Sequence, residues 1–156
     1  MGKFMGKLLV WVVALFVVAG VSASHAENKG TQAEAKALVA KAADFLKQNG
    51  KEKAMAEFNN PKGQFTDKDL HISAFTAKGV RLAQPGKPQM LGRSVTFSKD
   101  MDGKAYGQEM VDLAAKTGEG FVDYKFPDPS SNKAMAKSSY VLKVDDVVLT
   151  CGFYKP

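Results

Sequence analysis

Residues Lys137 to Tyr154 read KSSYVLKVDDVVLTCGFY, and this stretch decides the fold. Apolar residues alternate with other residues along both halves, which is the pattern of β-strands that have two different faces. Asp145 and Asp146 form a two-residue turn at its centre, so we predict an antiparallel hairpin in which Tyr140 lies opposite Cys151. Those two residues share a face with Leu142, Val144, Val147 and Leu149, and the other face carries Lys137, Val141, Val148 and Tyr154.

A second hairpin is predicted upstream, between Leu70 and Ala83. Its strands are LHISAFT (70–76) and VRLA (80–83), and the three residues AKG between them form a loop that ends on glycine. In this register Phe75 pairs with Arg81. One face then carries His71, Ser73, Phe75 and Arg81, whereas the other carries Leu70, Ile72, Ala74, Val80 and Leu82.

Helical spacing replaces the alternation in three segments. Between Thr31 and Asn49 an apolar stripe recurs every three or four residues, and Gly50 ends this helix. A short helix over 51–60 and another over about 105–116 follow. Together with a strand at 120–126, these segments predict an α+β domain in which a long N-terminal helix packs on an antiparallel sheet of about five strands, with one helix inserted.

The first 26 residues have the features of a secretory signal peptide. Two lysines precede a run of 14 apolar residues, and small residues stand at Ser24 and Ala26. We predict cleavage after Ala26, with Ala23 as the next choice. An uncleaved anchor is the alternative, although a spanning helix needs ~20 apolar residues. The expected domains are therefore a signal peptide at 1–26 and one domain at 27–156, located in the periplasm or secreted.

The composition of residues 27–156 argues against several classes of function. Without Lys3 and Lys7 the 22 basic residues become 20, against 16 acidic residues, and the resulting charge of +4 is scattered along the chain. An exported protein with scattered charge is not expected to bind nucleic acid. His71 is the one histidine in this range and Cys151 the one cysteine, so neither a zinc ligand set nor a disulfide framework is expected. We predict no enzyme, no catalytic residues and no cofactor.

One motif, SKDMDGKAYGQE, matches the spacing of a calcium-binding loop. Its candidate ligands are Ser98, Asp100, Asp102 and Glu109, with Gly103 at the position of the sharp turn. The preceding SVTF (94–97) reads as a strand rather than as the incoming helix of such a motif. We therefore interpret the segment as a polar turn that begins the third helix, and expect no metal site.

Several stretches in order resemble one family, the single Cache domain of type 2. The stretches are the long helix, DLHISAFTAKGVRLAQPGKPQMLGRS (69–94), the third helix with its following strand, and the C-terminal hairpin. The resemblance covers about Ala33 to Tyr154. It implies an extracytoplasmic sensor domain with a PAS-like sheet and a pocket for a small molecule, often a short-chain carboxylate. The family pattern HP-x-x-P-x-x-x-G falls on residues 84–92, with Gln84 where histidine is common.

The resemblance and the two hairpin faces together nominate ligand-binding residues. Arg81 and Lys137 would meet the charge of the ligand, because charged donors bind carboxylates well. Hydrogen bonds and walls would come from His71, Ser73, Tyr124 and Tyr140. Lys137 and Tyr140 face opposite sides of a regular strand, so both line one pocket only if that strand is bulged or twisted.

These observations predict a stand-alone, exported Cache-like domain that binds a small organic acid. Members of the family usually sit between two membrane spans, whereas this sequence ends two residues after Tyr154. We therefore expect a role in signal sensing, or as an accessory to a membrane sensor or transporter. The alternative is a non-binding interaction module that docks on a sensor kinase or transporter, or dimerises through its long helix.

Overall fold

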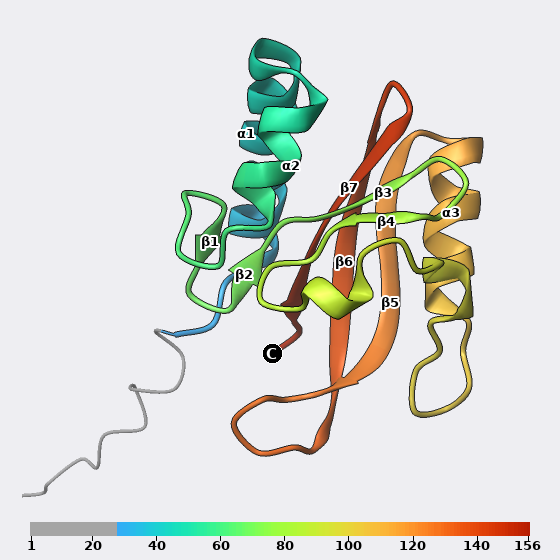
Figure 1. The fold of residues 1–156 in the computed structure, drawn as a ribbon. Coiled ribbons are helices and arrows are strands. Elements are labelled where there is room, and N and C mark those ends of the chain that lie inside the picture. The colour runs from blue at the N-terminus through green and yellow to red at the C-terminus, as the bar shows by residue number, and fades with distance from the viewer. Residues whose placement is uncertain (1–27) are drawn as a thin grey trace, which may run out of the picture.

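A five-stranded antiparallel sheet organises the part of the chain that the computed structural model describes, residues 28–156 (Figure 1). The strand order is β4-β3-β7-β6-β5. The strands are β3 (Ser73–Thr76), β4 (Arg81–Ala83), β5 (Glu119–Pro127), β6 (Ala134–Val144) and β7 (Val147–Tyr154). The predicted signal peptide, 1–26, lies outside the described residues. Within 28–156 none of the helices combines the length and the apolar character that a membrane span requires.

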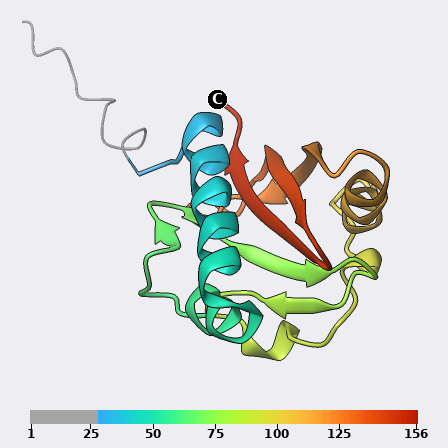
Figure 2. The ribbon, with the colours of Figure 1, turned by 90° about the horizontal axis from the view of Figure 1, so that it is seen from above.

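Helices cover both faces of the sheet. Helices α1 (Gln32–Asn49) and α2 (Lys51–Phe58) pack on one face, and α3 (Tyr106–Lys116) packs on the other. Figure 2 shows α1 and α3 on different sides of the strands. Helix α1 begins with a capping box, in which Thr31 Oγ1 accepts from the Glu34 amide and Glu34 Oε2 accepts from the Thr31 amide. Gly50, at φ 82°, ends α1 and lets the chain turn into α2.

The two faces of the sheet bury two separate apolar clusters. The face covered by α1 and α2, called the helix face below, carries the larger cluster. In this cluster the rings of Phe58 and Phe65 meet edge to face, with their centres 4.8 Å apart. On the α3 face a smaller cluster gathers around Val141 and Val148. The smaller cluster covers only part of its face, and polar side chains occupy the rest. The predicted fold, a long helix on a five-stranded sheet with one inserted helix, is thus confirmed.

Both predicted hairpins are present, and the C-terminal one has the predicted register throughout. Asp145 and Asp146 form the turn between paired Val144 and Val147, and Tyr140 pairs with Cys151. The β6–β7 pairing shows no register shift along its length. In the other hairpin Phe75 pairs with Arg81, but the register shifts between Ala74 and Phe75, so that β4 carries one extra residue. This β-bulge redirects the side chains that follow it.

Two predicted strands take other forms. SVTF is a 3₁₀-helix, η2 (Val95–Phe97), because the Ser94 hydroxyl accepts from the Thr96 amide and turns the chain. The stretch LHISAFT is divided at Ile72, whose amide donates to the Phe65 carbonyl. Its first part, β2 (Leu70–His71), pairs with the two-residue strand β1 (Thr66–Asp67) instead of continuing into the sheet. A second 3₁₀-helix, η1 (Pro88–Met90), lies in the loop after β4.

The residues with calcium-loop spacing interact with other parts of the chain. Asp100 accepts from the amides of Asp102, Lys104 and Lys125, and these hydrogen bonds lower its pKa. Asp102 pairs with Lys125 at 2.7 Å, and Glu109 pairs with Lys104 at 2.9 Å. The segment therefore connects the start of α3 to β5, as expected of a polar turn.

The aromatic cluster on the helix face gives a stability prediction. Phe58 is 1% exposed, whereas Phe97 is 84% exposed. Removing the buried ring leaves a cavity, so we expect Phe58→Ala to lower the free energy of unfolding by about 3–5 kcal/mol. The matched change Phe97→Ala should alter it by less than about 0.5 kcal/mol. Urea unfolding followed by circular dichroism measures both, and equal losses would contradict the assigned core.

Candidate ligand-binding site

A cavity of about 120 Å³ lies on the α3 face of the sheet, beside the smaller apolar cluster. This volume is well above the roughly 10–15 Å³ that one water requires. Strands β3, β4, β5, β6 and β7 provide most of its walls, and η2 and α3 close it from above. The polar residues that line it are His71, Ser73, Arg81, Gln84, Lys87, Ser98, Tyr106, Tyr124, Lys137, Ser139 and Thr150.

Five of the six predicted ligand-binding residues line this cavity. They are His71, Ser73, Arg81, Tyr124 and Lys137. Tyr140 does not, because the regular β6 strand turns it to the helix face, where it is 4% exposed. There its hydroxyl donates to Glu119, and Lys36 Nζ lies 5.3 Å from its ring centre. We predicted that Tyr140 lines the ligand site, and the register of β6 instead places it on the opposite face of the sheet.

Arg81 enters the cavity from β4 and is held by Gln84. Its Nη1 donates to Gln84 Oε1 at 2.6 Å, and Ser73 Oγ donates to the same oxygen at 3.1 Å. The Arg81 Nε is buried and has no hydrogen-bond partner within the described residues. A buried donor without a partner is costly, and a ligand that supplies an acceptor removes this cost. Burial also lowers the pKa of Arg81.

The same glutamine fixes the tautomer of His71. Because Gln84 Oε1 accepts from Arg81, the Gln84 amide nitrogen is the group that faces His71 Nε2, at 3.2 Å. An amide NH₂ only donates, so His71 Nε2 must accept and the ring proton lies on Nδ1. Burial, with Lys137 and Lys87 nearby, lowers the pKa of His71 to about 4. His71 is therefore neutral at physiological pH.

Lys137 enters the cavity from β6 and lies among aromatic rings. Its Nζ is 4.6 Å from the centre of the Tyr154 ring and 4.9 Å from that of Phe126. Such cation–π contacts stabilise a partly desolvated ammonium without neutralising its charge. Burial lowers the pKa of Lys137, and the nearby Asp69 carboxylate opposes this shift without forming an ion pair with the ammonium.

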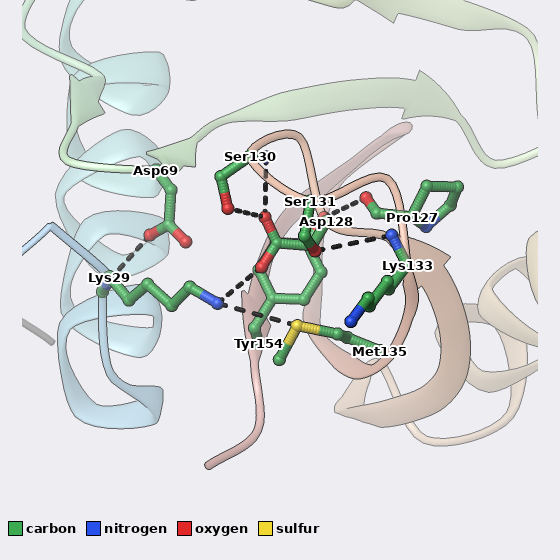
Figure 3. A network of polar contacts seen from close by, with 10 residues as sticks. Lys29, Asp69, Pro127, Asp128, Ser130, Ser131, Lys133, Met135 and Tyr154 are labelled. Carbon is green, nitrogen blue, oxygen red and sulfur yellow. Dashed lines mark hydrogen bonds and ion pairs between the residues drawn. The ribbon is translucent and has the colours of Figure 1, made fainter. Parts of the chain in front are cut away.

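Tyr154 also connects this end of the site to the segment before α1 (Figure 3). Lys29 Nζ lies 5.2 Å from the Tyr154 ring centre and pairs with Asp128 at 2.7 Å. The Tyr154 hydroxyl donates to the Pro127 carbonyl at 2.7 Å, which ties β7 to the loop between β5 and β6. The Lys29 ammonium holds the pKa of Asp128 well below its usual range. These contacts fix the ring on which Lys137 rests.

Two stacked tyrosines also line the cavity. The rings of Tyr106 and Tyr124 are 4.2 Å apart and nearly parallel, and the Tyr124 hydroxyl hydrogen-bonds Ser139 Oγ at 2.8 Å. Gly152 lies beneath them, where an added Cβ would be 2.7 Å from Lys137 Cε. A side chain at position 152 would therefore displace the end of Lys137, so glycine leaves room for Lys137 to extend into the cavity.

The chemistry of the cavity is that of an anion site. Arg81, Lys137 and the exposed Lys87 line it, and none of the lining residues in the described part of the chain is acidic. The ion pairs of residues 28–156 include neither Arg81 nor Lys137. Charged groups out of water need compensation, and a bound carboxylate would supply it.

Residues beyond the prediction also contribute to the cavity. Ser139, Thr150 and Gly152 follow from extending the alternation of the C-terminal hairpin. The position of Gln84 in the cavity could not be predicted from alternation, because a regular strand that starts at Arg81 would place Gln84 on the helix face. The bulge in β4 brings it to the cavity instead.

Comparison with known proteins relates this chain to bacterial chemoreceptors. Residues 10–155 match the family described as single Cache domain 2. A 60-residue stretch is 33% identical to methyl-accepting chemotaxis protein McpP of Pseudomonas putida KT2440. That match covers 38% of this chain and 11% of the receptor, so the chain spans a small part of this relative.

Three solved sensor structures share the fold. A methyl-accepting chemotaxis protein from Vibrio parahaemolyticus has a TM-score of 0.65 at 21% identity, over 78% of this chain and 86% of that one. A Cache chemosensory domain studied for carboxylic acid recognition has a TM-score of 0.59 at 22% identity, with the same coverage. The periplasmic sensor domain of a chemotaxis protein has a TM-score of 0.58 at 22% identity, over 78% of this chain and 88% of that one.

The order of elements, the PAS-like sheet and the family match agree along nearly the whole described chain. The family match extends over far more than half of the sequence. This protein belongs to the single Cache domain 2 family, a family of sensor domains.

Proposed function

We propose that this Cache domain acts outside the cytoplasm, in the periplasm or secreted, and binds a small organic acid in the cavity on its α3 face. The observation that carries the proposal is the buried, unpartnered Nε of Arg81, which points to a missing acceptor. Lys137 adds a second cation without a carboxylate partner in the described chain. A Cache domain of the same fold that is known for carboxylic acid recognition supports this assignment.

Ligand binding would serve signalling through a separate partner. The fold is shared with sensor domains of chemotaxis proteins, so a membrane-bound sensor is the partner that we favour, with a transporter as the other candidate. In this scheme the domain binds the acid in proportion to its concentration and does not convert it into another compound. The proposed site contains a neutral histidine and three basic residues, a composition that suits the binding of an acid.

The alternative role, docking through the long helix, finds less support. It requires an apolar stripe of α1 that is free to meet a partner. Ala35, Val39, Ala42, Ala43 and Leu46 of this helix are instead buried in the larger core cluster. This stripe is thus used within the domain itself.

The central role of Arg81 can be tested by calorimetric titration of the purified protein with acetate, propionate, lactate and pyruvate. We expect at least one to bind, and Arg81→Met to weaken it by about tenfold or more, because hydrogen bonds to a charged group are lost. Arg93 is exposed on the loop after β4, so Arg93→Met is the matched control and should leave affinity unchanged. Equal weakening by both changes would speak against a specific role for Arg81.

The low pKa of His71 predicts a pH dependence of stability. An unfolded histidine has a pKa near 6.5, whereas that of folded His71 is about 4. As the pH falls from about 6.5 to about 4, the unfolded chain binds a proton that the folded chain does not, so folding becomes less favourable. The loss amounts to roughly 3 kcal/mol.

His71→Gln removes this contribution while keeping a polar side chain. Urea unfolding at pH 7 and pH 4 should therefore show a loss of stability in the wild type that exceeds the loss in the variant by roughly 3 kcal/mol. Parallel losses in the two proteins would mean that His71 is solvated and titrates normally.

A further inference from the structure

We propose that the preferred ligand is a dicarboxylate, with one carboxylate bound by Arg81 and the other by Lys137. This inference rests on the proposed function, since it specifies the acid that the same cavity binds. Three features of the site support it: the number of uncompensated charges, the neutral partner of Arg81, and the positions of the two cations in the sheet.

Charge balance is the first feature. Arg81 and Lys137 are both partly withdrawn from water, and the cavity walls in the described chain carry no acid. Lys87 also borders the cavity, but it is exposed and water screens its charge. Asp69, which does not line the cavity, raises the pKa of Lys137 but forms no ion pair with it. A monocarboxylate would form an ion pair with one of the two partly buried cations and leave the other without one. A dianion compensates both, which is the condition for stable burial of charge.

The partner of Arg81 is the second feature. Gln84 accepts a hydrogen bond from Nη1 but brings no negative charge, so the guanidinium remains a full cation. Because Nη1 is occupied and Nε is unpartnered, the Nε edge of the guanidinium is the part that remains for a ligand. A planar carboxylate suits such an edge, since arginine presents its donors in a rigid fork. His71 adds no positive charge because it is neutral.

The positions of the cations are the third feature. Arg81 stands on β4 and Lys137 on β6, with β3 and β7 between these strands. Three strand spacings of about 4.8 Å separate the two backbones by roughly 14 Å. The side chains therefore reach the cavity from different sides, across a floor that includes Ser73, Thr150 and Gly152. An elongated ligand with an anionic group at each end suits two cations that enter the cavity from strands so far apart.

Titration of the purified wild-type protein at pH 7.5 with two matched pairs of acids tests the inference. The pairs are malonate with propionate and succinate with butyrate, and both carboxyl groups of the diacids are ionised at this pH. We expect the better diacid to bind about tenfold or more tightly than its monoacid partner. Equal or tighter binding of the monoacids overturns the dicarboxylate inference but leaves the proposed function standing. If neither these acids nor acetate, lactate or pyruvate binds, the proposed function fails as well.

Two lysine variants test whether Lys137 is the residue that causes the preference for diacids over monoacids. Lys137→Met keeps the length of the side chain but removes the charge, and should abolish the preference for the diacid with little effect on the monoacid. Lys143 is exposed on the same strand, so Lys143→Met lowers the net charge equally and should preserve the preference. Equal weakening of diacid and monoacid by Lys137→Met, or loss of the preference in Lys143→Met, contradicts the assignment. The wild-type titrations decide the ligand class even if Lys137→Met fails to fold.

Discussion

The pairing of β6 with β7 runs without a register shift from Lys137 and Tyr154 to Val144 and Val147, and both faces of the domain depend on it. Because side chains alternate strictly along paired strands, this register sends Tyr140 and Cys151 into the core beneath α1. It sends Lys137 and Ser139 to the opposite face, where the cavity lies. A shift of one residue would bury the lysine in the apolar core and expose the core residues. The apolar core and the ligand site are thus two consequences of one register.

The cavity depends on a second constraint, which is electrostatic. Most ion pairs of the described chain lie on the surface, where an ion pair contributes little to stability. Arg81 and Lys137 are different, because each is partly desolvated and neither forms an ion pair within residues 28–156. The hydrogen bond that Arg81 donates to Gln84, and the aromatic contact of Lys137 with Tyr154, hold these cations in place without neutralising them. We propose that both charges are thereby kept available for a bound anion.

The sequence was most informative where alternation is regular. It predicted the two hairpins, the register of the C-terminal one and the faces that bear His71, Ser73, Arg81 and Lys137, because strand geometry leaves few alternatives. Prediction failed where a local contact overrides the pattern. SVTF alternates like a strand, but the Ser94 hydroxyl turns it into a 3₁₀-helix. Gln84 reaches the cavity only through a bulge, which no pattern in the sequence marks. The resemblance to the family nominated both Lys137 and Tyr140, whereas the register of their strand predicted that only one of them faces the cavity unless the strand is bulged or twisted.

We propose that the buried Nε of Arg81 binds a carboxylate. A crystal structure of the protein grown with succinate would show whether it does. We expect a carboxylate within hydrogen-bonding distance of Arg81 Nε, with Gln84 still bound to Nη1 and the second carboxylate at Lys137 Nζ. Succinate bound elsewhere, or a cavity that holds only water under saturating succinate, would contradict it.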